Sequence, residues 1–223
     1  MKSFTTLMLA AAIGLSSYSA QATVIASYDL NNAIGTASPV TTVAPGFTLS
    51  ALTRSAALAG SAFGNHFYFS NWGTAVDVAK YLSFSVSKAA PYSLDLMTFS
   101  VESTDASSST VFVRSSKDGF TNNFASFTWA SPTTDVTNGS FDFSPLGVLS
   151  GLTEFRFYFT TVTSNVNVGF ANHEMPGAGG GLPDVGRDIV VNGTNVVSAP
   201  ASVALLGLGL LGLGLSRRKS KNN

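Results

Sequence analysis

Phe155-Arg156-Phe157-Tyr158-Phe159 (FRFYF) is the stretch of the chain that decides its fold. Its apolar rings alternate with Arg156 and Tyr158. This is the period of two with which successive side chains of a β-strand point to opposite faces of a sheet. Residues 82–87 (LSFSVS) show the same alternation, with serine at every second position. Both stretches therefore predict strands with one face in a core and the other turned outward.

The alternation recurs along the chain, and no long helical periodicity interrupts it between residues 23 and 197. Leu94 and Leu96 lie in one phase, whereas Phe99 and Val101 lie in the other, which predicts a β-bulge near Met97-Thr98. Further predicted strands are Val24–Leu30, Phe47–Thr53, His66–Ser70, Thr110–Arg114, Ala125–Trp129, Val166–Phe170 and Asp188–Val191.

Short polar and glycine-containing segments separate these strands and predict turns: Pro45-Gly46, Asn71-Trp72-Gly73, Lys117-Asp118-Gly119, Asn138-Gly139 and Asn192-Gly193. Many short strands without a helix predict an all-β fold, an antiparallel β-sandwich of two sheets. We expect a jelly-roll-like sandwich, and an immunoglobulin-like strand order is the alternative.

The N-terminal residues 1–22 have the layout of a secretory signal peptide. Lys2 is followed by an apolar stretch at residues 7–15 (LMLAAAIGL) and then by small residues at Ala20 and Ala22. We expect cleavage after Ala22, so that Thr23 begins the mature domain at residues 23–197.

The C-terminal residues 198–223 predict a membrane anchor. Residues 201–215 (ASVALLGLGLLGLGL) carry no charge, and the end at residues 216–223 contains Arg217, Arg218 and Lys219. A helix of this length spans roughly 22 Å, somewhat less than a hydrocarbon core of about 30 Å. The basic residues predict that the extreme C-terminus stays in the cytoplasm.

Ser198-Ala199-Pro200, the Leu/Gly segment and Arg217-Arg218-Lys219 together resemble a PEP-CTERM sorting tail. The family motif is Pro-Glu-Pro, and only Pro200 matches it here. The resemblance implies export in a Gram-negative bacterium that makes extracellular polysaccharide, with an exosortase-type processing enzyme as a partner. It implies an inner-membrane anchor in transit and a final location at the cell surface or outside the cell.

Composition limits what the mature domain can do. Residues 23–197 hold seven basic and twelve acidic residues, a net charge of −5, and the chain has no cysteine. A net-negative domain does not favour a phosphate backbone, so we expect no nucleic-acid partner. Without cysteine, thiol catalysis and cysteine-based metal sites are excluded.

No residue pattern predicts catalysis. His66 and His173 are the two histidines, and neither belongs to a zinc-protease motif or accompanies a G-x-S-x-G turn. We therefore expect a protein that is not an enzyme, with no catalytic residue and no cofactor beyond a structural calcium ion.

Calcium is the one metal for which the sequence offers ligands. Asp29 lies near the first predicted strand, and Asp184 and Asp188 lie near the last. Carboxylate oxygens suit calcium, and the three residues meet if the first and last strands pair.

Tyr68, Asn71 and Trp72 form the best predicted glycan contact, with Trp129 as a second choice. Sugar C–H faces stack on aromatic rings while amides bind the hydroxyl groups. We expect a structural component of the cell surface or extracellular matrix that is associated with exopolysaccharide. The alternative is a carbohydrate-binding module with a defined glycan site. Exposure of Tyr68 and Trp72 favours the module, and burial of both favours the structural component.

Overall fold

The computed structural model describes residues 22–30, 35–60, 66–104, 108–130, 136–163, 166–172 and 188–196. Within these residues there are thirteen strands, two short 3₁₀ turns and no α-helix, which confirms the all-β class. The strands are β1 (Thr23–Tyr28), β2 (Ala37–Ser38), β3 (Val40–Val43), β4 (Thr48–Leu49), β5 (Leu52–Arg54), β6 (His66–Phe69), β7 (Leu82–Ser103), β8 (Ser108–Ser115), β9 (Ala125–Ala130), β10 (Thr137–Asp142), β11 (Leu149–Thr161), β12 (Val168–Ala171) and β13 (Ile189–Asn195). The 3₁₀ turns are η2 (Ser116–Asp118) and η3 (Ser144–Leu146).

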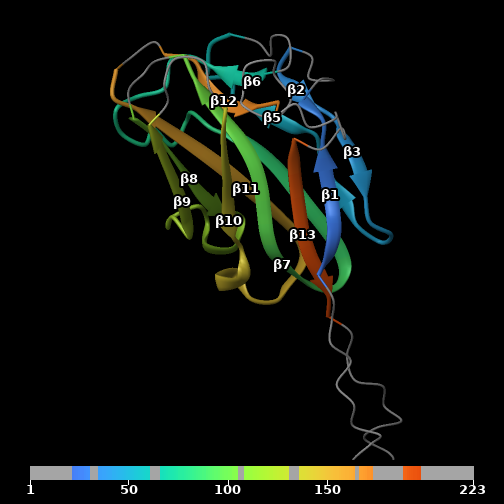
Figure 1. Ribbon diagram of the computed structural model, residues 1–223. Helices are drawn as coiled ribbons and strands as arrows, with labels where there is room; N and C mark the ends of the chain where they lie inside the picture. Colours follow the sequence, from blue (N-terminus) through green and yellow to red (C-terminus); the bar gives the residue numbers. More distant parts are fainter. Residues whose placement is uncertain are drawn as a thin grey trace, which may run out of the picture.

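The strands form two antiparallel layers that share one long strand (Figure 1). The first half of β7 pairs with β4 and β5 on one side and with β11 on the other, and β11 is followed by β8 and β9. The second half of β7 pairs with β10 on one side and with β13 and β12 on the other, and β13 is followed by β1 and β3. This arrangement confirms a sandwich-like, mostly antiparallel fold.

Strand β7 crosses from one layer to the other near exposed Ala89, Ala90 and Pro91. The predicted bulge is present, but it lies at Asp95 rather than at Met97-Thr98, because Asn192 pairs with Leu96 and Gly193 with Leu94. The extra residue reverses the phase of the strand. As a result Leu96 is partly exposed and Met97 is fully buried, opposite to the apolar face predicted for Leu96.

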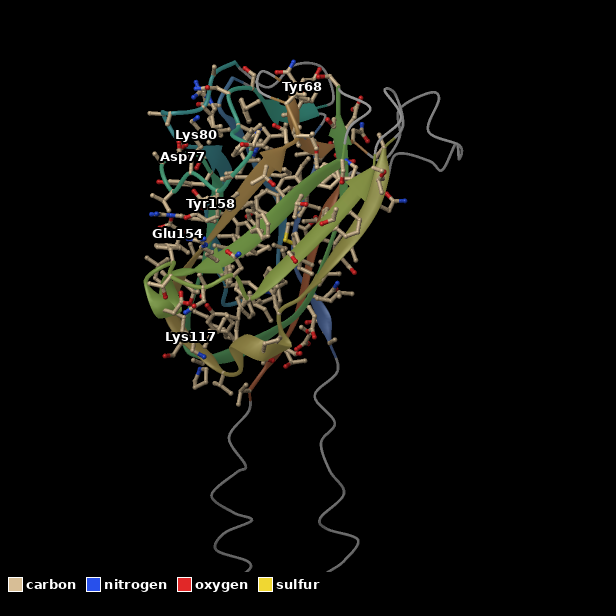
Figure 2. The ribbon with its side chains drawn as sticks, turned by 90° about the vertical axis from the view of Figure 1, so that its left-hand side faces the viewer. Tyr68, Asp77, Lys80, Lys117, Glu154 and Tyr158 are labelled. Atoms are coloured by element: carbon tan, nitrogen blue, oxygen red, sulfur yellow. The ribbon has the colours of Figure 1, made fainter. Side chains whose placement is uncertain are left out.

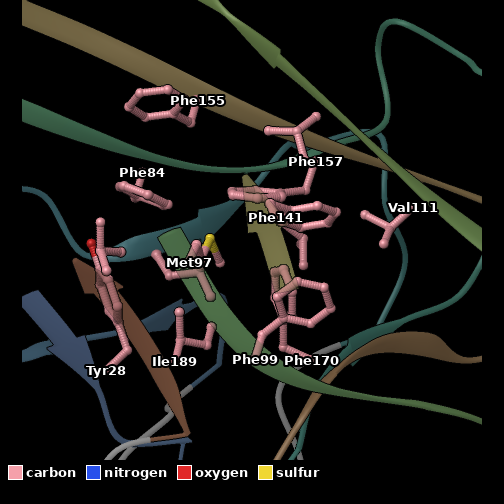
Figure 3. Packing of buried hydrophobic residues seen from close by; sticks show 14 of the residues in the cluster. Tyr28, Phe84, Met97, Phe99, Val111, Phe141, Phe155, Phe157, Phe170 and Ile189 are labelled. Atoms are coloured by element: carbon pink, nitrogen blue, oxygen red, sulfur yellow. The ribbon is translucent and has the colours of Figure 1, made fainter. Parts of the chain in front are cut away.

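The core between the layers is built largely of aromatic rings. Phe84 lies 5.4 Å from Phe155 and 5.7 Å from Phe157, measured between ring centroids. In the other layer the rings of Phe99 and Phe141 stack at 4.4 Å. Figure 3 shows these rings converging from strands far apart in the sequence. Each fully buried ring stabilises the fold by roughly 1.5–3 kcal/mol. The predicted burial of Phe155, Phe157 and Phe159 is confirmed, but Tyr158, predicted on the outward face, is also only 1 % exposed.

Two predicted turns are wrong. Asn138-Gly139 lies inside β10, and Asn192-Gly193 lies inside β13. Both glycines serve close packing instead: a Cβ atom on Gly139 would come within 2.7 Å of the Phe99 ring, and one on Gly193 within 2.3 Å of the Ser93 carbonyl oxygen. Glycine within a strand often marks such a close approach rather than a reversal.

The first and last strands of the domain are neighbours. Thr23 pairs with Gly193 and Tyr28 with Ile189, so the start of β1 and the end of β13 lie at one end of the sandwich. Residues 1–21 and 197–223, which hold most of the predicted signal peptide and the whole predicted sorting tail, lie outside the described residues. Within the described part of the chain, no helix has the length and apolar character needed to cross a membrane.

Candidate functional site

Trp72 is a core residue, which corrects its prediction as a sugar contact. The side chain is 2 % exposed, and its Nε1–H donates a hydrogen bond to the Val168 carbonyl oxygen at 3.0 Å. Its ring packs 5.0 Å from that of Phe159. Stacking on a sugar requires an exposed ring face, and Trp72 has none. Trp129, the second choice, is likewise only 4 % exposed.

Tyr68 and Asn71 do not form a platform with Trp72. Tyr68 is half-buried opposite Gly169, and burial together with the nearby charge of Glu102 raises the pKa of its phenol. Asn71 is exposed and adopts a left-handed backbone with φ of 70°. The two residues keep some solvent access, but the indole of Trp72, the third member of the predicted site, is buried in the core.

The pairing of β1 with β13 brings Asp29 and Asp188 to the same end of the two strands. Asp188 is only 6 % exposed, and its Oδ2 accepts a hydrogen bond from the Leu30 amide at 2.6 Å. Asp184 lies outside the described residues, and within those residues no three His, Cys, Asp or Glu side chains gather closely enough to hold a metal ion. The calcium site stays a prediction, and Asp188 has a structural role in ending β1.

The two histidines occupy different regions of the chain. His66 is the first residue of β6, and His173 lies outside the described residues. The expectation that neither is catalytic stays a prediction.

The outer face of the first layer carries a cluster that the sequence analysis did not single out as a site. Arg156 points outward from β11, and its guanidinium lies between two rings. Its central carbon is 3.8 Å from the Phe120 ring centroid and 4.3 Å from the Tyr81 ring centroid. Glu154 accepts a hydrogen bond from Arg156 Nε at 2.8 Å.

A second cation–ring pair adjoins the first. Arg114, which is opposite Arg156 on β8, places its guanidinium carbon 5.0 Å from the centroid of the Tyr158 ring. The rings of Tyr158 and Tyr81 are 6.0 Å apart. We call Tyr81, Arg114, Phe120, Arg156 and Tyr158 together the Arg156 face; Tyr158 is only 1 % exposed and is covered by its neighbours.

Electrostatics keep Arg156 charged although it is partly covered. Burial alone would lower the pKa of its guanidinium, but the hydrogen bond and the charge of Glu154 more than offset this and raise it. Tyr158 has the opposite balance: burial raises the pKa of its phenol, and the hydrogen bond from Arg156 lowers it by less. At neutral pH the Arg156 guanidinium is therefore positive, and the covered phenol of Tyr158 beside it is neutral.

Phe120 has a strained backbone. Its φ of 62° lies in the left-handed region, directly after Gly119 at 69°. Such a conformation is a true outlier for a bulky side chain, and strain of this kind collects at functional sites.

The loop around Phe120 holds this conformation by hydrogen bonds. The Phe120 amide donates to the Ser115 carbonyl at 2.9 Å, and Arg114 donates to the Phe120 carbonyl at 3.1 Å. Asp118 accepts hydrogen bonds from Asn122 and Thr121. Although slight burial acts to raise the pKa of Asp118, these bonds lower it overall.

Charged side chains of both signs lie on this side of the domain, and two of the cations pair with carboxylates there. Lys80 and Lys117 lie along the same side as Tyr158 and Glu154, as Figure 2 shows. Lys80 pairs with Asp77 at 3.5 Å, whereas Lys117 hydrogen-bonds to the neutral Leu146 carbonyl. Arg114 likewise donates to neutral oxygens, those of Asn123 and Phe120. Its charge and that of Lys117 are therefore the ones on this face best placed to attract an anion.

The sequence contained part of the signal for this cluster. The alternation that buries Phe155 and Phe157 also places Arg156 and Tyr158 on the opposite face of β11, where Tyr158 is only 1 % exposed. Tyr81, Arg114 and Phe120 join them only through strand pairing and through the loop after η2, so the cluster is visible only in the folded chain.

Comparisons with known proteins identify no family. No family model matches the chain, and no curated protein matches it. Among solved structures it is similar to an isomalto-dextranase of Arthrobacter globiformis T6 complexed with panose, with 13 % identity and a TM-score of 0.36, over 67 % of this chain and 31 % of that one. It is also similar to the enzymatically active domain of tailspike protein 4 of bacteriophage CBA120, with 14 % identity and a TM-score of 0.29, over 66 % of this chain and 19 % of that one. The chain thus spans less than a third of either structure, and neither likeness carries an argument about function.

Proposed function

We propose that the protein is an exported, non-enzymatic component of the cell surface or extracellular matrix that contacts polysaccharide through the Arg156 face. In this proposal it is a jelly-roll-like sandwich, delivered by the signal peptide at residues 1–22. The PEP-CTERM-like tail at residues 198–223 holds it in the inner membrane until an exosortase-type enzyme processes it.

The observation that carries the polysaccharide contact is the guanidinium of Arg156 held between two rings. Its separations from Phe120 and Tyr81 are those of cation–π contacts. Aromatic edges and faces pack against the C–H faces of sugars, and guanidinium groups bind carboxylates in bidentate fashion. Because the side chains of Arg114 and Lys117 donate to neutral oxygens and add positive charge, an acidic polysaccharide fits better than a neutral one.

The alternative, a carbohydrate-binding module with one defined glycan site, has a specific observation in its favour. Phe120 keeps a strained backbone while its ring covers Arg156. A strained backbone persists where it holds a side chain in place for binding, and a structural surface without a ligand has no such need. The burial of Trp72 points the other way, because it removes the strongest stacking ring from the surface.

Affinity electrophoresis of the purified protein, in gels that contain either a uronate-rich or a neutral polysaccharide, tests the contact. We expect retardation by the uronate gel, and at least a fivefold weaker apparent affinity for Arg156→Gln. The control is Lys88→Gln, which removes a cation stacked on Phe47 elsewhere in the domain. Equal retardation of wild type and Arg156→Gln would refute the site, and loss of binding in EDTA would add calcium to it.

The delivery part has separate tests. Mass spectrometry of the exported protein should find Thr23 at its N-terminus, and Met1 there would contradict the signal peptide. A chain that ends at Val197 should leave the inner-membrane fraction, and identical fractionation of both chains would contradict the tail. Release of reducing sugar ends from the bound polysaccharide would contradict the non-enzymatic assignment.

A further inference from the structure

Three of the seven large hydrophobic side chains that are exposed among the described residues lie at one end of the sandwich. Leu152, near the start of β11, is 68 % exposed, and Val148, directly before β11, is 58 % exposed. Val196, directly after β13, is also exposed, and so are the three residues where β7 changes layers. We call the whole set the aliphatic end: Ala89, Ala90, Pro91, Val148, Leu152 and Val196.

These residues form one surface although they come from three parts of the chain. The Val196 amide donates a hydrogen bond to the Pro91 carbonyl at 3.3 Å, which joins the end of β13 to the bend of β7. Leu149 pairs with Tyr92 and Leu152 with Ser87, which joins the start of β11 to the same bend. Figure 1 shows the bend, the connection from β10 to β11 and the last residues of β13 at one end of the molecule.

A cation lies at this end as well. Lys88 is opposite Gly151 and rests on the Phe47 ring, with its ammonium nitrogen 4.4 Å from the ring centroid. It donates a hydrogen bond to the side chain of Asn195, a neutral partner. Aliphatic side chains next to a lysine match the boundary of a bilayer, where apolar groups meet anionic headgroups.

The length of the chain beyond β13 restricts how far this end can be from a membrane. The predicted membrane-spanning segment begins at Ala201, five residues after Val196. Five extended residues span at most about 18 Å. The headgroup layer fills roughly 5–8 Å of that distance. While residues 201–215 cross the bilayer, the aliphatic end is therefore the part of the domain held nearest to the lipid.

We propose that the aliphatic end rests on the headgroup surface of the membrane while the tail anchors the protein. The inference depends on the proposed function, because it takes residues 201–215 as the anchor. Val148 and Leu152 enter the boundary between headgroups and acyl chains, and Lys88 faces the phosphates. A second copy of the chain is a poorer occupant, because stable association takes about 800 Å² per partner and this surface consists of a few small aliphatic side chains.

Site-directed fluorescence tests the proposal cleanly because the chain has no cysteine. Four single variants of the full-length chain are labelled with an environment-sensitive fluorophore: Val148→Cys, Leu152→Cys, Val162→Cys and Leu211→Cys. The protein is placed in vesicles that contain one-fifth anionic lipid and either headgroup or acyl-chain nitroxides. Val162 is the matched control: it is 61 % exposed and follows the other end of β11, about 33 Å from Leu152 at the rise of a strand.

We expect headgroup nitroxides to reduce the emission at Val148 and Leu152 at least twofold and to leave that at Val162 unchanged. Acyl-chain nitroxides should quench the label at Leu211, which reports the anchor alone. Quenching at Leu211 but not at Leu152 would overturn the membrane contact and leave the anchor intact. Absence of quenching at Leu211 would overturn the anchor and the contact together.

Two further outcomes would also overturn the contact. Equal quenching at Val162 and Leu152 would mean that the domain lies on the bilayer without a preferred end. An emission change at Leu152 that depends on protein density in vesicles without nitroxide would identify a second copy of the chain as the occupant.

Discussion

Replacing Phe120 with asparagine separates the role of its ring in binding from any role in stability. The residue has φ of 62°, and the left-handed region costs a bulky L-residue about 1–2 kcal/mol. Asparagine tolerates this region far better. The substitution also removes the cation–π interaction with Arg156 at 3.8 Å, which at a partly exposed site is worth about 0.5–1 kcal/mol. Asparagine still bears part of the left-handed cost, so the strain relieved and the interaction removed have opposite effects on the free energy of unfolding and offset each other to within about 1 kcal/mol.

The expected thermal shift is therefore small. One kcal/mol corresponds to about 2–4 °C in Tm for a domain of this size, so we expect the Tm of Phe120→Asn to stay within about 3 °C of wild type. Polysaccharide affinity should fall about five- to tenfold, because the variant lacks a ring whose stacking on sugar is worth about 1 kcal/mol or more. Thermal denaturation by circular dichroism and affinity electrophoresis measure the two quantities.

Asn71→Gly is the matched control, because Asn71 has the other positive φ among the described non-glycine residues and its side chain donates to the Ala57 carbonyl rather than to a member of the Arg156 face. It should leave binding unchanged. If Phe120→Asn lowers the Tm by more than about 6 °C while binding is retained, the ring is a packing element and the assignment of the face is wrong.

The strands and loops allow three more predictions. Gly193→Ala should lower the free energy of unfolding by about 3 kcal/mol, because its Cβ would lie 2.3 Å from a strand carbonyl oxygen. Gly151 has a positive φ and open space around it, so Gly151→Ala should lower the free energy of unfolding by only about 1–2 kcal/mol. Equal losses for the two variants in urea denaturation would contradict this. Asp188→Ala should cost about 2 kcal/mol by leaving the buried Leu30 amide without its acceptor, and a change below about 0.5 kcal/mol would show that the bond contributes little. NMR titration should give the Asp118 carboxyl a pKa below 3.8. Because its folded pKa is lowered, its contribution to stability is fully present above pH 3.8 and is lost as the pH falls through the folded pKa. A measured pKa at or above 3.8 would refute the hydrogen bonding of the loop.

The strands were predictable because their apolar faces are buried at every second residue. Phe155, Phe157 and Phe159 needed no tertiary information to be assigned to a core. The bulge in β7 was also detectable as a change of phase, but its exact position depends on which residue of β13 pairs with it. Local patterns therefore indicate that a strand exists, and register decides its details.

The continuous β7 and the two strand glycines could not be predicted in this way. Nothing at residues 89–91 distinguishes a chain that turns back from one that passes into the other layer. Asn138-Gly139 and Asn192-Gly193 have the composition of a hairpin turn. What places them inside strands is the ring of Phe99 and the backbone of Ser93, which lie close in space but far away in sequence.

Trp72 illustrates the same limit for the candidate site. Its neighbours Asn71 and Gly73 indicate a surface turn, and an aromatic ring in a turn is a reasonable sugar contact. The indole instead donates to the Val168 carbonyl of β12, so the largest side chain of the turn is buried while Asn71 is exposed. Composition can locate a turn, but the direction of each side chain depends on what lies opposite.

The two proposed surfaces are geometrically compatible, which was not guaranteed. Arg156 lies four residues beyond Leu152 on β11, about 13 Å along the strand. Both side chains project from the outer face of β11, but Leu152 lies at the end of the strand that adjoins the bend of β7. A domain that rests on its aliphatic end would therefore raise the Arg156 face above the headgroups and keep it open to polysaccharide. Substitutions distinguish the two surfaces. Changes at Val148 or Leu152 should alter nitroxide quenching without altering retardation by polysaccharide, and changes at Arg156 should alter retardation without altering quenching.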